Sequence, residues 1–147
     1  MMKLLIVDDE RGSREALRQI FSLEYTVFAT ATADEAQTVL AREEVDLVLL
    51  DVVMPGRSGL DLLRQIHVDQ PDLPVIMVSA SISIPPIVEA IRQGAVDFVS
   101  KPFDVENILH LVRRALETKR LHRQVAVLKT ELSTAFPTQQ ILSLIHI

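Results

Sequence analysis

The chain of 147 residues contains no cysteine and no tryptophan, and it has only four glycines and one tyrosine. Without cysteine it can form no disulfide framework, no thiolate zinc site and no cysteine nucleophile. No apolar run approaches the roughly 18 residues that cross a membrane. The first segment, Met1–Val7, turns acidic at Asp8 and is too short for a signal peptide. We therefore expect a cytoplasmic protein with no membrane contact.

Hydrophobic residues make up 48% of the chain, which is enough to build a core for one domain, or for one domain and an extension. The net charge of −5 is unevenly spread, because residues 1–112 carry −9 and residues 113–129 carry +5. This change predicts an acidic body followed by a basic segment. We expect the first domain over residues 1–116 and a helical linker, a possible coiled coil, over residues 117–141. The basic segment is typical of a solvated helix face; direct DNA contact is the weaker alternative, because no recognition motif accompanies the charge.

Short apolar segments alternate with helical patterns along the acidic part of the chain. The predicted strands are residues 3–7, 25–30, 47–50, 75–78 and 97–99. The predicted helices are residues 13–23, 34–43 and 60–69, one that begins near Pro85-Pro86 and ends at Gly94, and a last helix capped by Asp104. Such alternation is typical of an α/β fold with a doubly wound, five-stranded parallel sheet and helices on both faces.

Polar residues follow four of these strands, at the edge of the sheet where open α/β folds bind ligands. They are Asp8-Asp9-Glu10, Asp51, Ser79 and Lys101. Each has an ordinary explanation alone, as an acid near a helix start, a turn residue, a loop hydroxyl or a solvated lysine. Together they favour one shared site. Neighbouring strands lie about 4.8 Å apart, so Asp8, Asp9 and Asp51 would crowd together. They cannot all stay ionised unless a cation joins them or their pKa values rise, and Mg²⁺ is the natural cation for such a site.

Four motifs give these residues a recognisable setting. They are Leu-Ile-Val-Asp8-Asp9-Glu, Leu-Leu-Asp51-Val-Val-Met-Pro-Gly, Met-Val-Ser79-Ala and Gly94-Ala-Val-Asp-Phe98-Val-Ser-Lys101-Pro102-Phe. In these motifs the chain, from Lys3 to about Leu116, resembles the receiver domain of two-component response regulators. The resemblance implies a flavodoxin-like (CheY-like) sheet of order 2-1-3-4-5.

The resemblance also implies a function, that of a phosphorylatable signalling switch and not of an enzyme with a separate substrate. Asp51 would accept a phosphoryl group from a sensor histidine kinase. Asp9, Asp51 and the backbone carbonyl of Val53 would bind Mg²⁺, and Asp8 would act on it mainly through water. The apolar side chain of Val53 leaves the lifetime of the aspartyl phosphate open.

Three further residues receive roles from the same resemblance. Ser79 and Lys101 would each contact a phosphoryl oxygen, and Phe98 would be the aromatic residue that changes rotamer when Ser79 moves. A cis peptide bond between Lys101 and Pro102 would aim the lysine over the strand ends. The base rate of cis bonds before proline is only about 5–6%, so the resemblance alone supports that expectation.

Two other functions are compatible with parts of the pattern. A haloacid-dehalogenase-like phosphatase also uses Asp, Ser, Lys and Mg²⁺, but it would carry an Asp-x-Asp motif on the first strand. A flavodoxin-like flavin carrier would need a Ser/Thr/Gly-rich phosphate loop after the first strand. Here Asp8-Asp9-Glu10 occupies that place and would repel a phosphate unless Mg²⁺ intervened.

The segment after residue 116 has apolar residues at a 4-3-4 spacing, namely Leu121, Val125, Leu128 and Leu132. This spacing predicts that the last helix continues and forms a homodimer, although it could also extend the packing stripe of that helix. The basic linker resembles the nitrogen-regulator class of sigma-54-dependent enhancer-binding activators, so DNA would be bound only through an output domain outside this chain. Residues 142–147, Leu-Ser-Leu-Ile-His-Ile, resemble the translation of a transposase adaptor, so we expect a non-native tail; a genuine short tail is the alternative.

Overall fold

The computed structural model describes residues 1–52, 59–80, 91–92 and 94–132, with side chains up to residue 118. The chain divides into two units, Met1–Leu116 and Glu117–Ile147. The first unit contains the whole sheet, and in the second the backbone of residues 117–132 is helical. Among the described residues, no helix is both long and apolar enough to cross a membrane.

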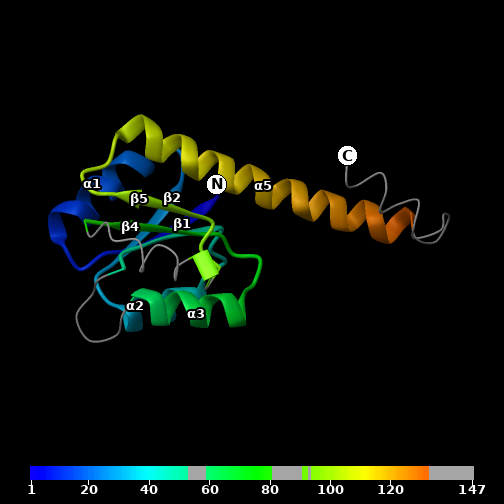
Figure 1. The fold of residues 1–147 in the computed structure, drawn as a ribbon, viewed down its shortest axis with the longest axis horizontal. Helices are drawn as coiled ribbons and strands as arrows, with labels where there is room; N and C mark the ends of the chain where they lie inside the picture. Colours follow the sequence, from blue (N-terminus) through cyan, green and yellow to red (C-terminus); the bar gives the residue numbers. More distant parts are fainter. Residues whose placement is uncertain (53–58, 81–90, 93, 133–147) are drawn as a thin grey trace. The chain divides into compact units, whose positions relative to one another are not determined.

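The first unit is built on five parallel strands (Figure 1). They are β1 (Lys3–Val7), β2 (Thr26–Thr30), β3 (Leu47–Leu50), β4 (Val75–Ser79) and β5 (Asp97–Ser100). Their order in the sheet is β2-β1-β3-β4-β5, as the sequence predicted. Because β1 lies between β2 and β3, the chain reverses its direction of winding beside β1. Ligands bind at such a reversal in open α/β sheets.

Helices cover both faces of the sheet. They are α1 (Arg11–Phe21), α2 (Ala33–Arg42), α3 (Gly59–Asp69) and α5 (Val105–Leu132). In Figure 1, α1 and the first turns of α5 lie on one side of the strands, and α2 and α3 lie on the other. Helix α5 continues past Leu116, as predicted, whereas most of the helix predicted from Pro85-Pro86 lies outside the described residues.

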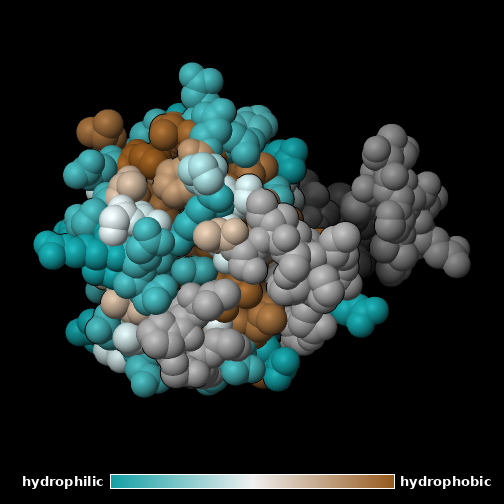
Figure 2. Space-filling model, turned by 60° about the vertical axis from the view of Figure 1, so that its left-hand side comes forward, coloured by the Kyte–Doolittle hydropathy of each residue, from teal (hydrophilic) through white to brown (hydrophobic). Residues whose placement is uncertain are grey.

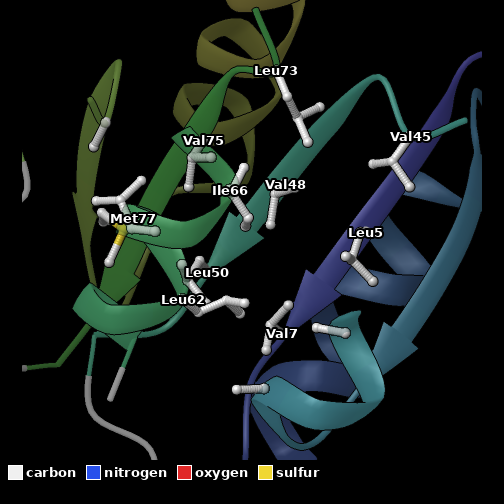
Figure 3. Packing of buried hydrophobic residues seen from close by; sticks show 14 of the residues in the cluster. Leu5, Val7, Val45, Val48, Leu50, Leu62, Ile66, Leu73, Val75 and Met77 are labelled. Carbon is white, nitrogen blue, oxygen red and sulfur yellow. The ribbon is translucent and has the colours of Figure 1, made fainter. Parts of the chain in front are cut away.

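Two hydrophobic cores form because successive side chains of a strand point to opposite faces. In β1, Leu4 and Ile6 pack with residues of α1 and α5, whereas Leu5 and Val7 pack with residues of α2 and α3. Figure 3 shows the second core, in which Leu62 and other side chains of α3 meet the strands. All four of these β1 residues are fully buried, which explains why the strand is apolar throughout instead of alternating.

Side-chain caps fix the starts of two helices. Thr32 caps α2 by accepting a hydrogen bond from the Glu35 amide at 3.2 Å, and the Glu35 carboxylate reaches back to accept one from the Ala31 amide at 3.1 Å, just before the cap. Asp104 accepts a hydrogen bond from the amide of Glu106 at 3.0 Å and caps α5, as predicted. Helix α1 begins at Arg11, two residues before the predicted start.

Candidate functional site

The backbone places three of the predicted site residues just beyond the strand ends. The Asp8 amide donates to the Thr30 carbonyl at 3.0 Å, the Asp51 amide to Val7 at 2.9 Å, and the Lys101 amide to Ser79 at 2.9 Å. Each bond continues the pairing with the neighbouring strand by one residue. The side chains are therefore brought to one edge of the sheet by the strand register rather than by loop conformation.

Asp8, Asp9 and Asp51 form one carboxylate cluster, as the sequence predicted. Each offers a carboxylate oxygen, and these oxygens all lie within 4.8 Å of one another. Asp8 is 1% exposed and Asp51 is 6% exposed, whereas Asp9 is exposed to solvent. Two buried carboxylates beside a third are costly unless cations compensate their charge.

Lys101 is the cation that faces this cluster. Its Nζ donates to Oδ2 of Asp8 at 2.7 Å and lies 3.5 Å from Oδ2 of Asp51 and 3.7 Å from Oε2 of Glu10. Burial by itself lowers the pKa of Lys101, but the hydrogen bond to Asp8 and the charges of Asp8, Asp51 and Glu10 outweigh it and raise that pKa above its usual value. The Lys101–Pro102 peptide bond is cis, which confirms the prediction.

Every polar group of Asp8 has a hydrogen-bond partner. Besides the bonds to Thr30 and Lys101, its Oδ1 accepts a hydrogen bond from the Glu10 amide at 2.9 Å. Its backbone carbonyl accepts one from Nη1 of Arg14 at 2.9 Å. Asp8 is thus a fixed element of the site, whereas Asp9 beside it is exposed.

The other predicted residues lie around the cluster. Ser79 ends β4 and is 2% exposed. Phe98 lies on β5, is half-buried and packs against the core beneath α2 and α3. Val53, predicted to offer its carbonyl to a metal, lies outside the described residues.

The donor set of the cluster fits a hard divalent cation. All three side chains offer carboxylate oxygens, which Mg²⁺ and Ca²⁺ prefer, and the site has no sulfur or imidazole ligand among the described residues. Lys101 compensates one of the negative charges, which leaves the cluster with excess negative charge. Figure 2 turns the side with the carboxyl ends of the strands forward, where hydrophilic residues prevail among those described.

Two residues near the cluster were not predicted as part of the site. Arg14 binds the carbonyl of Asp8, and Gly59 packs against the backbone of Asp51 and Val52. Glu10, which the sequence placed with Asp8 and Asp9 at the end of the first strand, lies 3.7 Å from Lys101. The sequence marks Arg14 only as a charged residue near the start of a helix. Gly59 follows a loop rich in proline and glycine, and nothing in the sequence separates a close backbone approach from an ordinary turn.

A comparison with protein families identifies the family of the chain. Residues 4–113 match the model of the response regulator receiver domain. The chain belongs to this family. Membership supports the receiver interpretation over the phosphatase and the flavin carrier, and it confirms the resemblance found in the four motifs.

Other receiver-containing proteins are similar in sequence. The chain is 41% identical over 122 residues to the C4-dicarboxylate transport transcriptional regulatory protein DctD of Pseudomonas aeruginosa, covering 81% of this chain and 26% of that protein. It is 38% identical over 129 residues to the nitrogen assimilation regulatory protein NtrX of Azorhizobium caulinodans, covering 86% and 28%. The chain thus spans about a quarter of the length of these curated relatives.

Solved receiver structures share the fold. A crystal structure of NtrX from Brucella abortus has a TM-score of 0.81 and 39% identity, and covers 87% of this chain and 30% of that one. A CheY-like receiver domain protein from Methanospirillum hungatei has a TM-score of 0.80 and 28% identity, with 83% and 98% covered. The second comparison covers nearly the whole Methanospirillum hungatei chain, so the part of this chain that matches it corresponds to an entire receiver domain.

Proposed function

We propose that this receiver domain is a phosphorylatable switch in which Asp51 accepts a phosphoryl group from a sensor histidine kinase. The observation that carries the proposal is the position of Lys101, whose Nζ lies 3.5 Å from Asp51 within a cluster that also holds Asp8 and Asp9. A buried carboxylate beside a cation can act as the nucleophile, and the two further acids can hold a divalent cation that offsets the negative charge of the phosphoryl group.

In this reaction a carboxylate oxygen of Asp51 attacks phosphorus and forms an acyl phosphate. The bond between phosphorus and the histidine nitrogen of the kinase breaks, and that nitrogen keeps the electron pair and later takes up a proton. Lys101 compensates charge on one phosphoryl oxygen, and the hydroxyl of Ser79 donates a hydrogen bond to another. The cost of bringing a phosphoryl group to an acidic site is lowered by these two donors.

Mg²⁺ is the proposed cofactor, held by Asp9 and Asp51 and by the carbonyl of Val53, with Asp8 acting mainly through water. A bound Mg²⁺ would offset the charge of the carboxylates and of the phosphoryl oxygens. The donor set supports this assignment, and so does the surplus of negative charge that Lys101 leaves.

The proposed output is a conformational change that begins at Ser79. Movement of its hydroxyl towards the phosphoryl group would leave space for the ring of Phe98, which is half-buried on the neighbouring strand β5. Ser79 and Phe98 would thus form an element with two conformations, and the charge of the phosphoryl group would shift the population between them. Phosphorylation would not power a separate catalytic reaction.

We propose that this receiver is one part of a longer transcription regulator. We infer a receiver over residues 1–116, a helical linker over residues 117–141 and a non-native tail over residues 142–147. The relatives are named as transcriptional and nitrogen regulators, and this chain spans about a quarter of their length. That proportion supports an output domain outside this chain that controls transcription. The 4-3-4 spacing of Leu121, Val125, Leu128 and Leu132 supports a homodimer formed through the linker helix.

The test is intact mass spectrometry after incubation with Mg²⁺ and acetyl phosphate. Wild-type protein should gain a single phosphoryl group, and chelation of Mg²⁺ should prevent the gain. Asp51→Asn should remain unmodified, whereas Asp61→Asn, the same change on an exposed residue of α3, should be modified like the wild type. Undiminished labelling of Asp51→Asn would contradict the assignment.

A further inference from the structure

Arg14 makes a contact with the site to which the proposed chemistry assigns no task. It lies on α1 and is half-buried, and its Nη1 donates to the backbone carbonyl oxygen of Asp8 at 2.9 Å. Its own amide donates to the Glu10 carbonyl at 3.0 Å within the first turn of the helix. The side chain therefore reaches back from α1 to the end of β1, across the acidic segment Asp8-Asp9-Glu10.

The carbonyl that Arg14 holds belongs to the peptide group that joins Asp8 to Asp9. A peptide group is planar, so fixing its carbonyl also fixes its N–H and the direction in which the chain continues to the Cα of Asp9. Asp8 has three other anchors, in Thr30, Glu10 and Lys101. Asp9 is exposed, and the direction of its carboxylate depends on the peptide group that precedes it.

We propose that Arg14 is a positioning residue for cation binding: it holds the Asp8–Asp9 peptide so that the Asp9 carboxylate faces Asp51. The inference rests on the proposed function, because it requires that Asp9 and Asp51 bind a divalent cation together. Arg14 itself does not touch the cation. It acts through the backbone, as outer partners commonly do when they orient the ligands of a metal site.

Electrostatics alone predicts the opposite effect, so the sign of the result is decisive. Arg14 carries a positive charge near the cluster, and a charge of the same sign repels a divalent cation. If charge were its only influence, replacing Arg14 with a neutral residue would strengthen Mg²⁺ binding. If the hydrogen bond to Asp8 positions Asp9, the same replacement weakens Mg²⁺ binding.

The experiment measures Mg²⁺ affinity by isothermal titration calorimetry of the full chain at constant ionic strength. Arg14→Met keeps an apolar stem but removes the donors and the charge. The Kd of Mg²⁺ for Arg14→Met should rise about 10-fold, the lower end of the effect seen when residues that orient metal ligands are replaced. Arg14→Lys, which keeps the charge and one donor group, should fall between the wild type and Arg14→Met.

Arg18→Met is the matched control. Arg18 lies one turn further along α1, is exposed, and pairs only loosely with Glu15 at 3.9 Å. Arg18→Met removes the same charge from the same helix, but Arg18 does not contact Asp8. The Kd of Mg²⁺ for this variant should stay within about twofold of the wild-type value, because exposed charges are well screened. In the metal-free protein, the amide nitrogen resonance of Asp9 should shift in Arg14→Met and stay unchanged in Arg18→Met.

Several results would overturn the inference. An Arg14→Met variant that binds Mg²⁺ as tightly as the wild type, or more tightly, would show that Arg14 acts only through charge or only on stability. If Arg14→Met does not fold, Arg14→Gln is measured in the same way and has to meet the same criterion. The proposed function fails separately, when wild-type protein itself binds no Mg²⁺ or when Asp9→Asn and Asp51→Asn bind it normally.

Discussion

Gly59 lies so close to Asp51 that it has no room for a side chain. A Cβ at position 59 would overlap the carbonyl oxygen of Asp51 and would lie 2.9 Å from the Cα of Val52. The Gly59 amide also donates to the Val52 carbonyl at 3.0 Å. The start of α3 therefore supports the backbone of the proposed phosphoacceptor directly.

Gly59→Ala should displace the backbone of Asp51 and Val52. Forcing a methyl group into packed backbone costs about 1–3 kcal/mol, so the free energy of unfolding should fall by that amount, and labelling by acetyl phosphate should slow. Denaturant unfolding and intact mass measure the two effects. Gly12→Ala is the control, because a Cβ at position 12 meets no atom within 4 Å and Gly12 lies in α1. It should be neutral or add up to about 1 kcal/mol of stability, and an equal loss in both variants would contradict the close approach at Gly59.

Lys101→Met should destabilise the domain by about 3 kcal/mol, because it leaves the buried carboxylates of Asp8 and Asp51 without their cation. The folded protein raises the pKa of Lys101, so its contribution is fully present below the ordinary lysine pKa of 10.5 and is lost as the pH rises through the raised value. The difference in the free energy of unfolding between the wild type and Lys101→Met should thus be constant from neutral pH to about 10 and shrink above pH 10.5.

Lys3→Met is the control for that experiment. Lys3 also pairs with a carboxylate, Glu43, at 3.0 Å, but both side chains are more than a third exposed. Such pairs contribute at most about 1 kcal/mol, so Lys3→Met should change the free energy of unfolding by less than that. If Lys101→Met and Lys3→Met lose the same free energy of unfolding, the burial of the Lys101 ion pairs does not add to their contribution.

Tyr25 offers a direct titration, because it is the only tyrosine in a chain without tryptophan. Burial and the charge of Glu24 raise its pKa above 10.0, and Arg113 opposes the rise. In an absorbance titration of tyrosinate, Glu24→Gln should lower the pKa of Tyr25 and Arg113→Gln should raise it further. Arg114→Gln, which removes a partner of Asp97, should leave it unchanged.

The titration of Tyr25 also has a consequence for stability. A raised pKa means that the folded state keeps the phenol proton longer than the unfolded state does. The contribution of Tyr25 is therefore present below pH 10.0 and is lost as the pH rises through the raised value. A Tyr25→Phe variant should lose less stability between neutral pH and pH 11 than the wild type, and a larger loss in the variant would show that the direction is wrong.

The proposed homodimer predicts a difference between the full chain and a chain that ends at Leu116, the end of the first unit. The full chain should sediment as a dimer at high concentration, because the apolar residues of the linker helix gain little unless a second copy covers them. Added salt should strengthen the dimer by screening its basic residues. If both the full chain and the chain that ends at Leu116 are monomeric at high concentration, with and without a phosphoryl analogue, dimerisation through this helix is ruled out.

The sequence predicted the five strands, because short apolar segments alternate with helical patterns, and the order of the strands followed from the resemblance to receiver domains. It also brought Asp8, Asp9, Asp51 and Lys101 together, because parallel strands end at one edge. The contacts of Arg14 and Gly59 could not be predicted in the same way. They depend on how α1 and α3 approach the strand ends, and neither a charged residue on a helix nor a glycine after a loop specifies that approach. The cis bond at Pro102 was predicted only through family resemblance, since its physical base rate is low.

The backbone bonds that continue the strand pairing at Asp8, Asp51 and Lys101 have an evolutionary consequence. Each residue is located by the neighbouring strand, so the connecting loops can change in length or composition without displacing these backbone anchors. Partner recognition can then diverge in the loops while the same chemistry is retained. By contrast, deletion of a single residue within β3 would turn its buried side chains to the opposite core and misplace Asp51, so the strands tolerate substitution far better than changes of length.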